Sequence, residues 1–168
     1  MVQSGLVDDP RVSQFRLAAH LGLAFLIFAA MLWTALSLLD ARRADLGTTG
    51  ARRTRAFAIA FVALVFAMVI AGAFVAGIRA GFAYNTFPLM NGRVVPAEIM
   101  MIEPWYLNFF NNMATVQFDH RALAWLLAFT VPAFWVAARR ASLAPEARRA
   151  TTLMLAMLAV QIALGIAT

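Results

Sequence analysis

Residues 56–78, AFAIAFVALVFAMVIAGAFVAGI, form an apolar run that contains no charged side chain. A helix of about 20 apolar residues is long enough to cross the roughly 30 Å hydrocarbon core of a bilayer. Three further predominantly apolar runs of similar length lie at about residues 13–39, 113–138 and 147–168. The sequence therefore predicts an all-α, polytopic membrane protein, a transmembrane helical bundle of four spans.

The composition agrees with a membrane protein and excludes several other classes. Of the 168 residues, 63% are hydrophobic, more than a soluble domain normally contains. The chain has no Cys, so disulfides, thiolate metal ligands and iron–sulfur sites are excluded within it. The net charge is +6, and all 14 basic residues are Arg. Because the Arg residues gather in short segments between the apolar runs, they indicate membrane topology and not a nucleic-acid interface.

The distribution of Arg predicts how the chain lies across the membrane. The segments at about 40–55 and 139–149 carry nine Arg together, whereas the longer connection at about 80–112 carries little net charge. Short loops rich in Arg stay on the cytoplasmic side of a membrane. We therefore expect the amino terminus and the 80–112 connection on the outer side.

The chain contains two histidines, and both are candidate metal ligands. His20 lies in RLAAHLGLAF, and His120 lies in TVQFDHRALAW (Thr115–Trp125), where polar residues interrupt an apolar span. Ionisable groups in hydrocarbon must be paired or solvated, so such a cluster marks a candidate site. Each histidine follows its predicted helix start by about seven residues, which places both roughly 10 Å below the outer end at 1.5 Å per residue.

Haem iron is the metal that suits this set of ligands. A bis-imidazole haem needs one histidine from each of two helices, whereas a structural zinc site usually takes four protein ligands. Arg16 lies one turn outward from His20, and Arg121 is adjacent to His120. A guanidinium group at such a place would pair with a haem propionate. Two alternatives remain open: histidines that are only structural hydrogen-bonding groups, and a proton relay that includes Asp119.

The connection between the second and third spans mixes aromatic residues and Met with single polar groups. Trp105 and Tyr106 suit the membrane–water interface, so we expect a short amphipathic segment over the outer mouth of the bundle. Interfacial anchoring alone and a lid over a site are both open as its role. Close helix packing is indicated before this connection by Gly72, Gly77 and Gly81.

Three segments of the chain form a specific combination: AGAFVAGIRAGFAYNTFPLMNG (residues 71–92), PWYLNFFNN…VQFDHR (residues 104–121) and FRLAAHLGLAF (residues 15–25). Together they resemble the haem A synthase family, membrane enzymes of cytochrome oxidase assembly that convert a methyl group of haem O to a formyl group. The resemblance implies an oxidoreductase with eight helices in two pseudo-symmetric bundles. Each bundle would hold a haem between two histidines, one haem being a bound haem b and the other the substrate haem O.

The resemblance places this chain at roughly helices 4 to 7 of the eight. It makes residues 1–39 the last helix of the amino-terminal bundle, 40–55 a cytoplasmic loop, and 56–168 the first three helices of the carboxy-terminal haem b bundle. His20 is then a ligand of the substrate haem, and His120 is a ligand of haem b. The second ligand of each iron would lie outside this chain, and a fragment of this kind is expected to be inactive alone.

The resemblance carries no catalytic residue onto this chain, because Gln117 stands where the other bundle of the family has its Glu. The candidate partners of the haem propionates are Arg16, Arg79 and Arg121. The implied partners are haem O, membrane lipid, a haem O synthase and a second copy of the protein. The implied location is a bacterial plasma membrane or the mitochondrial inner membrane.

Two other functions are compatible with the same residues. In a small membrane b-type cytochrome, an electron carrier, His20 and His120 would bind one haem between them. In a helical transporter or an assembly subunit, both histidines would be structural and no haem would bind.

Overall fold

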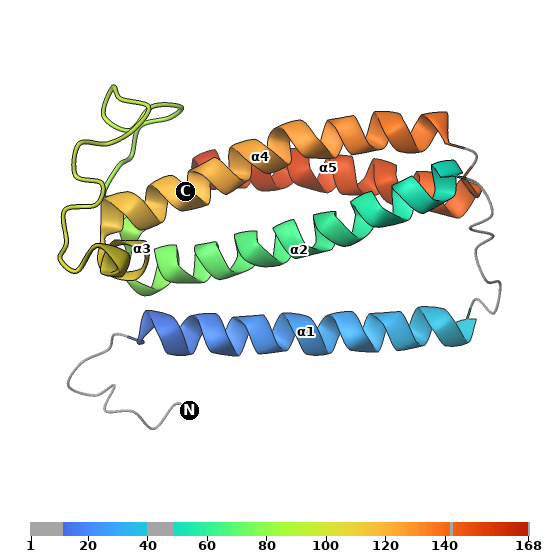
Figure 1. Cartoon of the computed structure of the whole chain (residues 1–168), viewed down its shortest axis with the longest axis horizontal. Helices are drawn as coiled ribbons and strands as arrows, with labels where there is room; N and C mark the ends of the chain where they lie inside the picture. The colour runs from blue at the N-terminus through green and yellow to red at the C-terminus, as the bar shows by residue number, and fades with distance from the viewer. Residues whose placement is uncertain (1–11, 40–48, 142, 168) are drawn as a thin grey trace. The chain divides into compact units, whose positions relative to one another are not determined.

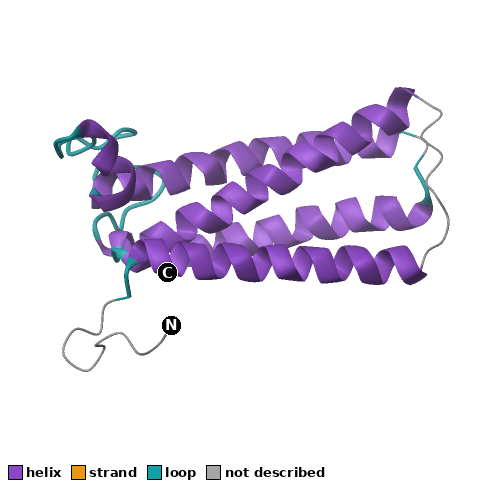
Figure 2. Ribbon diagram, turned by 60° about the horizontal axis from the view of Figure 1, so that its bottom comes forward, coloured by secondary structure: helices purple, strands orange, loops and turns teal. Residues whose placement is uncertain are grey.

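The structure is a computed structural model that describes residues 12–39, 49–141 and 143–167. It is all-helical over these residues, which contain no β-strand (Figures 1 and 2). The long helices are α1 (Gln14–Leu39), α2 (Thr49–Gly77), α4 (Met113–Arg140) and α5 (Pro145–Ala167). The short ones are η1 (Ala80–Phe82), η2 (Trp105–Leu107) and α3 (Asn108–Asn111). All four long helices are long and apolar enough to cross a membrane, which confirms the predicted class.

The second helix differs from its prediction at its amino-terminal end. We expected it to start at Ala56, whereas α2 starts at Thr49 and takes in part of the predicted loop. The remaining loop residues, 40–48, lie outside the described residues. Ala and Arg are strong helix formers, so the TGARRTR segment continues the helix beyond the apolar run. Apolar residues therefore mark the part of the helix that suits the membrane, not the point where the helix begins.

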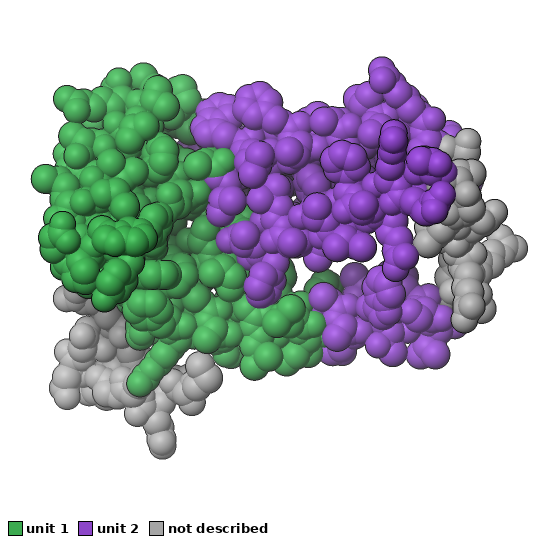
Figure 3. All heavy atoms as spheres, in the orientation of Figure 1, with its two compact units in different colours: residues 1–28, 68–122 green, residues 29–67, 123–168 purple. Residues whose placement is uncertain are grey.

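The chain divides into two compact units, which Figure 3 shows in different colours. Unit 1 consists of residues 1–28 and 68–122, and unit 2 of residues 29–67 and 123–168. The helices α1, α2 and α4 each contribute residues to both units, whereas α5 belongs to unit 2 alone. Both histidines fall in unit 1. The predicted membrane orientation stays a prediction.

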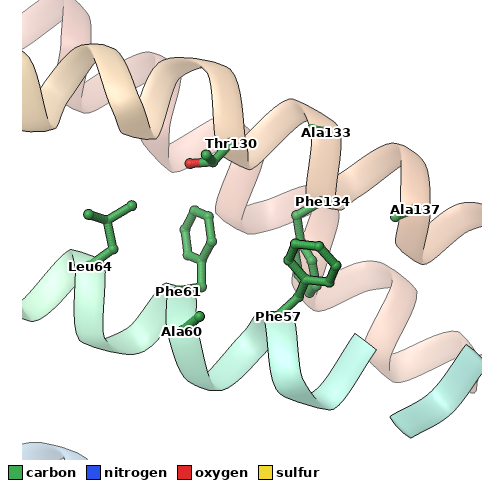
Figure 4. Close-up of a pocket in the computed structure, with 8 residues that line it drawn as sticks. All are labelled: Phe57, Ala60, Phe61, Leu64, Thr130, Ala133, Phe134 and Ala137. Carbon is green, nitrogen blue, oxygen red and sulfur yellow. The ribbon is translucent and has the colours of Figure 1, made fainter. Parts of the chain in front are cut away.

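Unit 2 is held together by aromatic rings from α2 and α4. The ring of Phe134 lies 5.9 Å from that of Phe61 and 6.4 Å from that of Phe57, measured between centroids. Beside these rings is an apolar hollow of about 250 Å³ (Figure 4). It is lined by Phe57, Ala60, Phe61, Leu64, Thr130, Ala133, Phe134 and Ala137. The lining includes no titratable or metal-ligating side chain, so this hollow offers no ligand to a metal.

In unit 1, α1 and α2 lie very close together at Gly77. A Cβ atom on Gly77 would lie only 2.6 Å from the Cα atom of Gln14, so any side chain there would force the two backbones apart. Gly81, by contrast, faces open space. Three rings from α1, α2 and α3 pack together with centroids 5.4, 5.6 and 5.7 Å apart: Phe15, Phe74 and Phe110. The close helix packing predicted from the glycines is therefore confirmed at Gly77.

The connection between α2 and α4 is ordered by the side chain of Asn108, which is fully buried. Its Nδ2 donates to the carbonyl oxygens of Ile102 and Trp105, both at 2.7 Å. Its Oδ1 accepts from the N–H of Ile102 and from Nδ2 of Asn112, both at 2.9 Å. The Asn108 amide therefore bonds to residues before it in the chain, Ile102 and Trp105, and to Asn112 after it.

Asn112 joins the same connection to the start of α4. Its Oδ1 accepts from the N–H groups of Ala114 at 2.9 Å and Thr115 at 3.2 Å, which is the arrangement of a helix N-cap. Its Nδ2 donates to the carbonyl of Glu98 at 2.8 Å. The N–H of Met100 adds a bond to Oγ1 of Thr115 at 3.2 Å. Side-chain hydrogen bonds thus join the connection to the first turn of α4 within unit 1.

Candidate functional site

His120 lies on the part of α4 that belongs to unit 1, and its ring packs against α2 at Gly72. A Cβ atom on Gly72 would lie 3.3 Å from Cε1 and 3.8 Å from Nδ1 of the imidazole. Because Gly72 has no side chain, the imidazole ring can lie directly against the backbone of α2. The Nδ1 atom is buried and has no hydrogen-bond partner. Nε2 is not among the enclosed atoms, so it is the nitrogen that a ligand can reach.

Gln117 lies one turn before His120 on the same face of α4 and is 6% exposed. Its Nε2 donates to the carbonyl of Tyr84 at 3.0 Å and, more weakly, to that of Gly81 at 3.5 Å. Its Oε1 is buried without a partner. In the described part of the chain, Oε1 of Gln117 and Nδ1 of His120 are the only two buried side-chain polar atoms that lack one. Such atoms are rare in folded proteins and call for a functional explanation.

The guanidinium of Arg121 fixes to α4 the connection between α2 and α4 (residues 78–112), which is called the outer connection after its predicted side of the membrane. Its Nη2 donates to the carbonyl of Tyr84 and its Nη1 to the carbonyl of Thr86, both at 2.8 Å. The Tyr84 carbonyl thus accepts from both Arg121 and Gln117. What the structure shows for Arg121 is a contact with the main chain, and its pairing with a propionate stays a prediction.

The other predicted site residues are exposed. His20 and Arg16 lie on α1, and neither makes a hydrogen bond or ion pair within the described residues. Arg79 is also exposed and precedes η1 with a left-handed backbone, φ 56°. The structure therefore brings His120 and Arg121 together with the start of the outer connection, and it leaves the other three available to a partner. Their roles as ligand and propionate partners stay predictions.

A buried tyrosine and a glutamate link two points of the outer connection that lie 14 residues apart. The hydroxyl of Tyr84 donates to Oε2 of Glu98 at 2.5 Å, and the Tyr84 ring packs against Met90 and Ala114. Burial, together with the bond to Glu98, raises the pKa of Tyr84 to about 12. The same bond lowers the pKa of the Glu98 carboxyl. At neutral pH the pair is therefore a neutral phenol that donates to a carboxylate, the stronger kind of hydrogen bond.

This pair predicts a pH window for the stability of the connection. Because the pKa of Glu98 is lowered on folding, its contribution is present above the ordinary value of 4.5 and is lost as the pH falls through the folded value. Because the pKa of Tyr84 is raised, its contribution is complete below 10 and is lost as the pH rises to about 12. The thermal unfolding midpoints of the unmutated protein and Tyr84→Phe should differ by a constant amount between these limits. The difference should shrink at both extremes, and one that does not change with pH would contradict the assignment.

The described residues contain no group of three or more His, Cys, Asp or Glu side chains that could hold a metal ion by themselves. A haem asks less of the protein, because the macrocycle supplies four nitrogens and the chain adds only axial ligands. His120 fits that requirement, since its ring is seated on Gly72 and one nitrogen is left accessible. The site is thus suited to half of an axial pair.

Comparison with known proteins identifies the family of the chain. Residues 1–168 match the model of the family described as "Cytochrome oxidase assembly protein". The chain belongs to this family. Among its relatives, the Heme A synthase of Nitrosospira multiformis is 61% identical over 168 residues, which are 100% of this chain and 47% of the relative. The Heme A synthase COX15 of Bos taurus is 42% identical over 174 residues, which are 100% of this chain and 42% of the relative.

As a member of the cytochrome oxidase assembly family, the chain spans less than half the length of these curated relatives. No solved structure matches it. The relatives confirm the resemblance to the haem A synthases that the sequence motifs predicted. Members of this kind are oxidoreductases, and the four helices make this one a membrane protein.

Several residues that order the site were not found from the sequence. Asn108, Asn112, Tyr84 and Glu98 each bond across the outer connection, and only Asn112 left a local signal. An Asn directly before an apolar helical run is a helix-start signature, and Asn112 occupies that place before α4. The other three act over longer separations and have no such signature.

Proposed function

We propose that this chain is part of a haem A synthase, which oxidises a methyl group of haem O to a formyl group. Its family and its relatives support this, because they match the chain over its whole length. The observation that carries the proposal is the imidazole of His120, which is half-buried on Gly72 with one nitrogen enclosed and the other accessible. A histidine held in this way in a membrane helix is built to bind an axial position of a haem.

In this proposal the two histidines serve different haems. His120 holds haem b, which supplies a one-electron redox centre when bound. His20 on α1 holds the substrate haem O, and Arg16 and Arg79 are available for propionates. Conversion of the methyl group with water, R–CH₃ + H₂O → R–CHO + 4 H⁺ + 4 e⁻, requires an acceptor for four electrons. The chain presents no carboxylate at Gln117, so the proton acceptor for this chemistry would come from the remainder of the protein.

The proposed setting follows from the same assignment. The amino-terminal end of α1 and the outer connection would lie on the outer side of a bacterial plasma membrane or mitochondrial inner membrane. A haem O synthase would deliver the substrate, and the apolar exposed faces of the helices would contact lipid, the rest of the protein or a second copy. Haem O, being apolar apart from its propionates, would remain within the membrane between the two enzymes.

The test is conversion of haem O in membranes. The longest reading frame that contains this chain should be expressed in cells that make haem O but lack their own haem A synthase. We expect haem A to appear in the extracted haems, identified by chromatography and by a mass that gains one oxygen and loses two hydrogens. Extracts in which haem O accumulates unchanged, although the protein is present in the membrane, would contradict the proposal.

A second candidate is a small b-type cytochrome. It is favoured by one observation, that both histidines belong to unit 1. In that case His20 and His120 would bind the same iron, and either substitution would remove the same haem.

A further inference from the structure

We infer that Gln117 and Gly72 position the imidazole of His120, Gln117 by accepting a hydrogen bond from Nδ1–H and Gly72 by leaving the ring its place on α2. The inference rests on the proposed role of His120 as a haem ligand. It assigns a task to the two buried polar atoms that otherwise have none, Oε1 of Gln117 and Nδ1 of His120.

The orientation of the Gln117 amide is fixed by its neighbours. The carbonyl oxygen of Tyr84 can only accept a hydrogen bond, so the atom of Gln117 that faces it at 3.0 Å must be the NH₂ group. The carbonyl of Gly81 is a second acceptor on that side. The amide therefore cannot be turned over, and Oε1 is the atom left buried without a donor.

The two unpartnered atoms are complementary. Oε1 of Gln117 is an acceptor only, whereas Nδ1 of a neutral imidazole can carry the ring proton and donate it. Residues three apart on a helix are neighbours on its surface. The structure records no bond between these two atoms, so the proposed bond requires a rotation of the side chains toward each other. A hydrogen bond between them would satisfy both buried atoms, and a buried polar atom without a partner is destabilising.

The consequence concerns which nitrogen of His120 is free. With the proton held on Nδ1, the lone pair of the ring is on Nε2, the accessible nitrogen. Histidines that ligate metals almost always donate their other N–H to an acceptor, which sets the tautomer and the ring direction. Gly72 fixes the direction of the ring plane, because a methyl group at this position would lie 3.3 Å from Cε1 and would turn the ring.

The experiment uses the full-length protein purified with its haems and four variants. Gln117→Leu removes the acceptor at similar size, and Gln117→Glu keeps an oxygen acceptor at the same place. Gly72→Ala adds the methyl group under the ring, and Gly81→Ala is its matched control, since a Cβ atom there meets nothing within 4 Å. For each variant we would measure haem b affinity and the electron paramagnetic resonance g values of the low-spin iron.

We expect Gln117→Leu to weaken haem b binding by roughly 10–100-fold, the usual effect of losing the partner of a ligating histidine. Gln117→Glu should restore most of the affinity. Gly72→Ala should shift the g values of the iron, which respond to the direction of the imidazole plane, whereas Gly81→Ala should leave them unchanged. A merely structural role would lower the unfolding temperature but leave the g values of the remaining bound haem as they were.

Unchanged affinity and g values in both Gln117→Leu and Gly72→Ala would overturn the inference. If Gln117→Leu does not fold, the decision falls to Gly72→Ala against Gly81→Ala, and equal g values in this pair would overturn it as well. If instead the proposed role of His120 as a haem ligand is wrong, the His120→Ala variant should retain haem b. Loss of haem b in His120→Ala with no effect at Gln117 and Gly72 would refute the positioning role alone.

Discussion

The His120→Ala variant of the full-length protein is expected to lose haem b. The imidazole is the only ligand that α4 offers to the iron in the described residues, and alanine at that position leaves one axial position without a protein group. A haem with one of its two histidines missing should dissociate during purification or remain as a five-coordinate, high-spin species. The haem content per protein, measured as the pyridine haemochrome, and the low-spin absorption bands report the loss. An unchanged low-spin spectrum would contradict the assignment.

The matching variant His20→Ala separates the proposed function from its rival. If the two histidines serve different haems, His20→Ala should keep haem b and lose binding of the substrate haem O. If they bind one haem, as in a small b-type cytochrome, the spectra of His20→Ala and His120→Ala should show the same loss. The comparison therefore identifies the number of sites as well as the ligands.

Asn108→Ala is expected to be the most destabilising substitution in the outer connection. It would leave the N–H and carbonyl of Ile102 without this partner, and it would remove one of two bonds from the carbonyl of Trp105 and from Nδ2 of Asn112. Each buried polar group that loses its hydrogen bond costs about 1–3 kcal/mol, so the total should reach several kcal/mol. Thermal unfolding in detergent measures the change, and limited proteolysis should cut the connection between α2 and α4 first.

Asn111→Ala is the matched control for this prediction. Asn111 is the same residue type and lies three residues after Asn108 in α3, but it is exposed and accepts a single bond, from Nε2 of Gln14 at 2.8 Å. A solvent-exposed bond of this kind contributes about 1 kcal/mol or less. Equal loss of stability in Asn108→Ala and Asn111→Ala would show that the buried amide is not the organising group.

The helices could be predicted because a single physical requirement, length in hydrocarbon, governs them. The first, third and fourth spans start and end within a few residues of their predicted bounds. The start of α2 at Thr49 was missed for the same reason, since hydropathy does not report on a helix that continues outside the membrane. The helix propensity of Ala and Arg carried that information instead.

The site could be predicted only where it lies on one helix. Spacing places Gln117 on the face of His120, but no spacing connects either of them with Gly72, which lies far away in the sequence. Arg121 is a second example of a contact that the sequence does not predict. Its position beside a histidine suggested a propionate partner, whereas its donors reach main-chain carbonyls of the connection, which carry no sequence signal.

The absent side chain of Gly77 has a consequence for the order in which the protein is made. The contact joins the first residue of α1 to the last residue of α2, two helices that are consecutive in the chain. It can therefore form as soon as the ribosome has released α2 into the membrane. The ring of Phe110 arrives only later, so the aromatic cluster must close onto a helical hairpin that already exists. Assembly would then proceed from the hairpin to the outer connection, and Gly72 on α2 would be in the membrane before His120 reaches it.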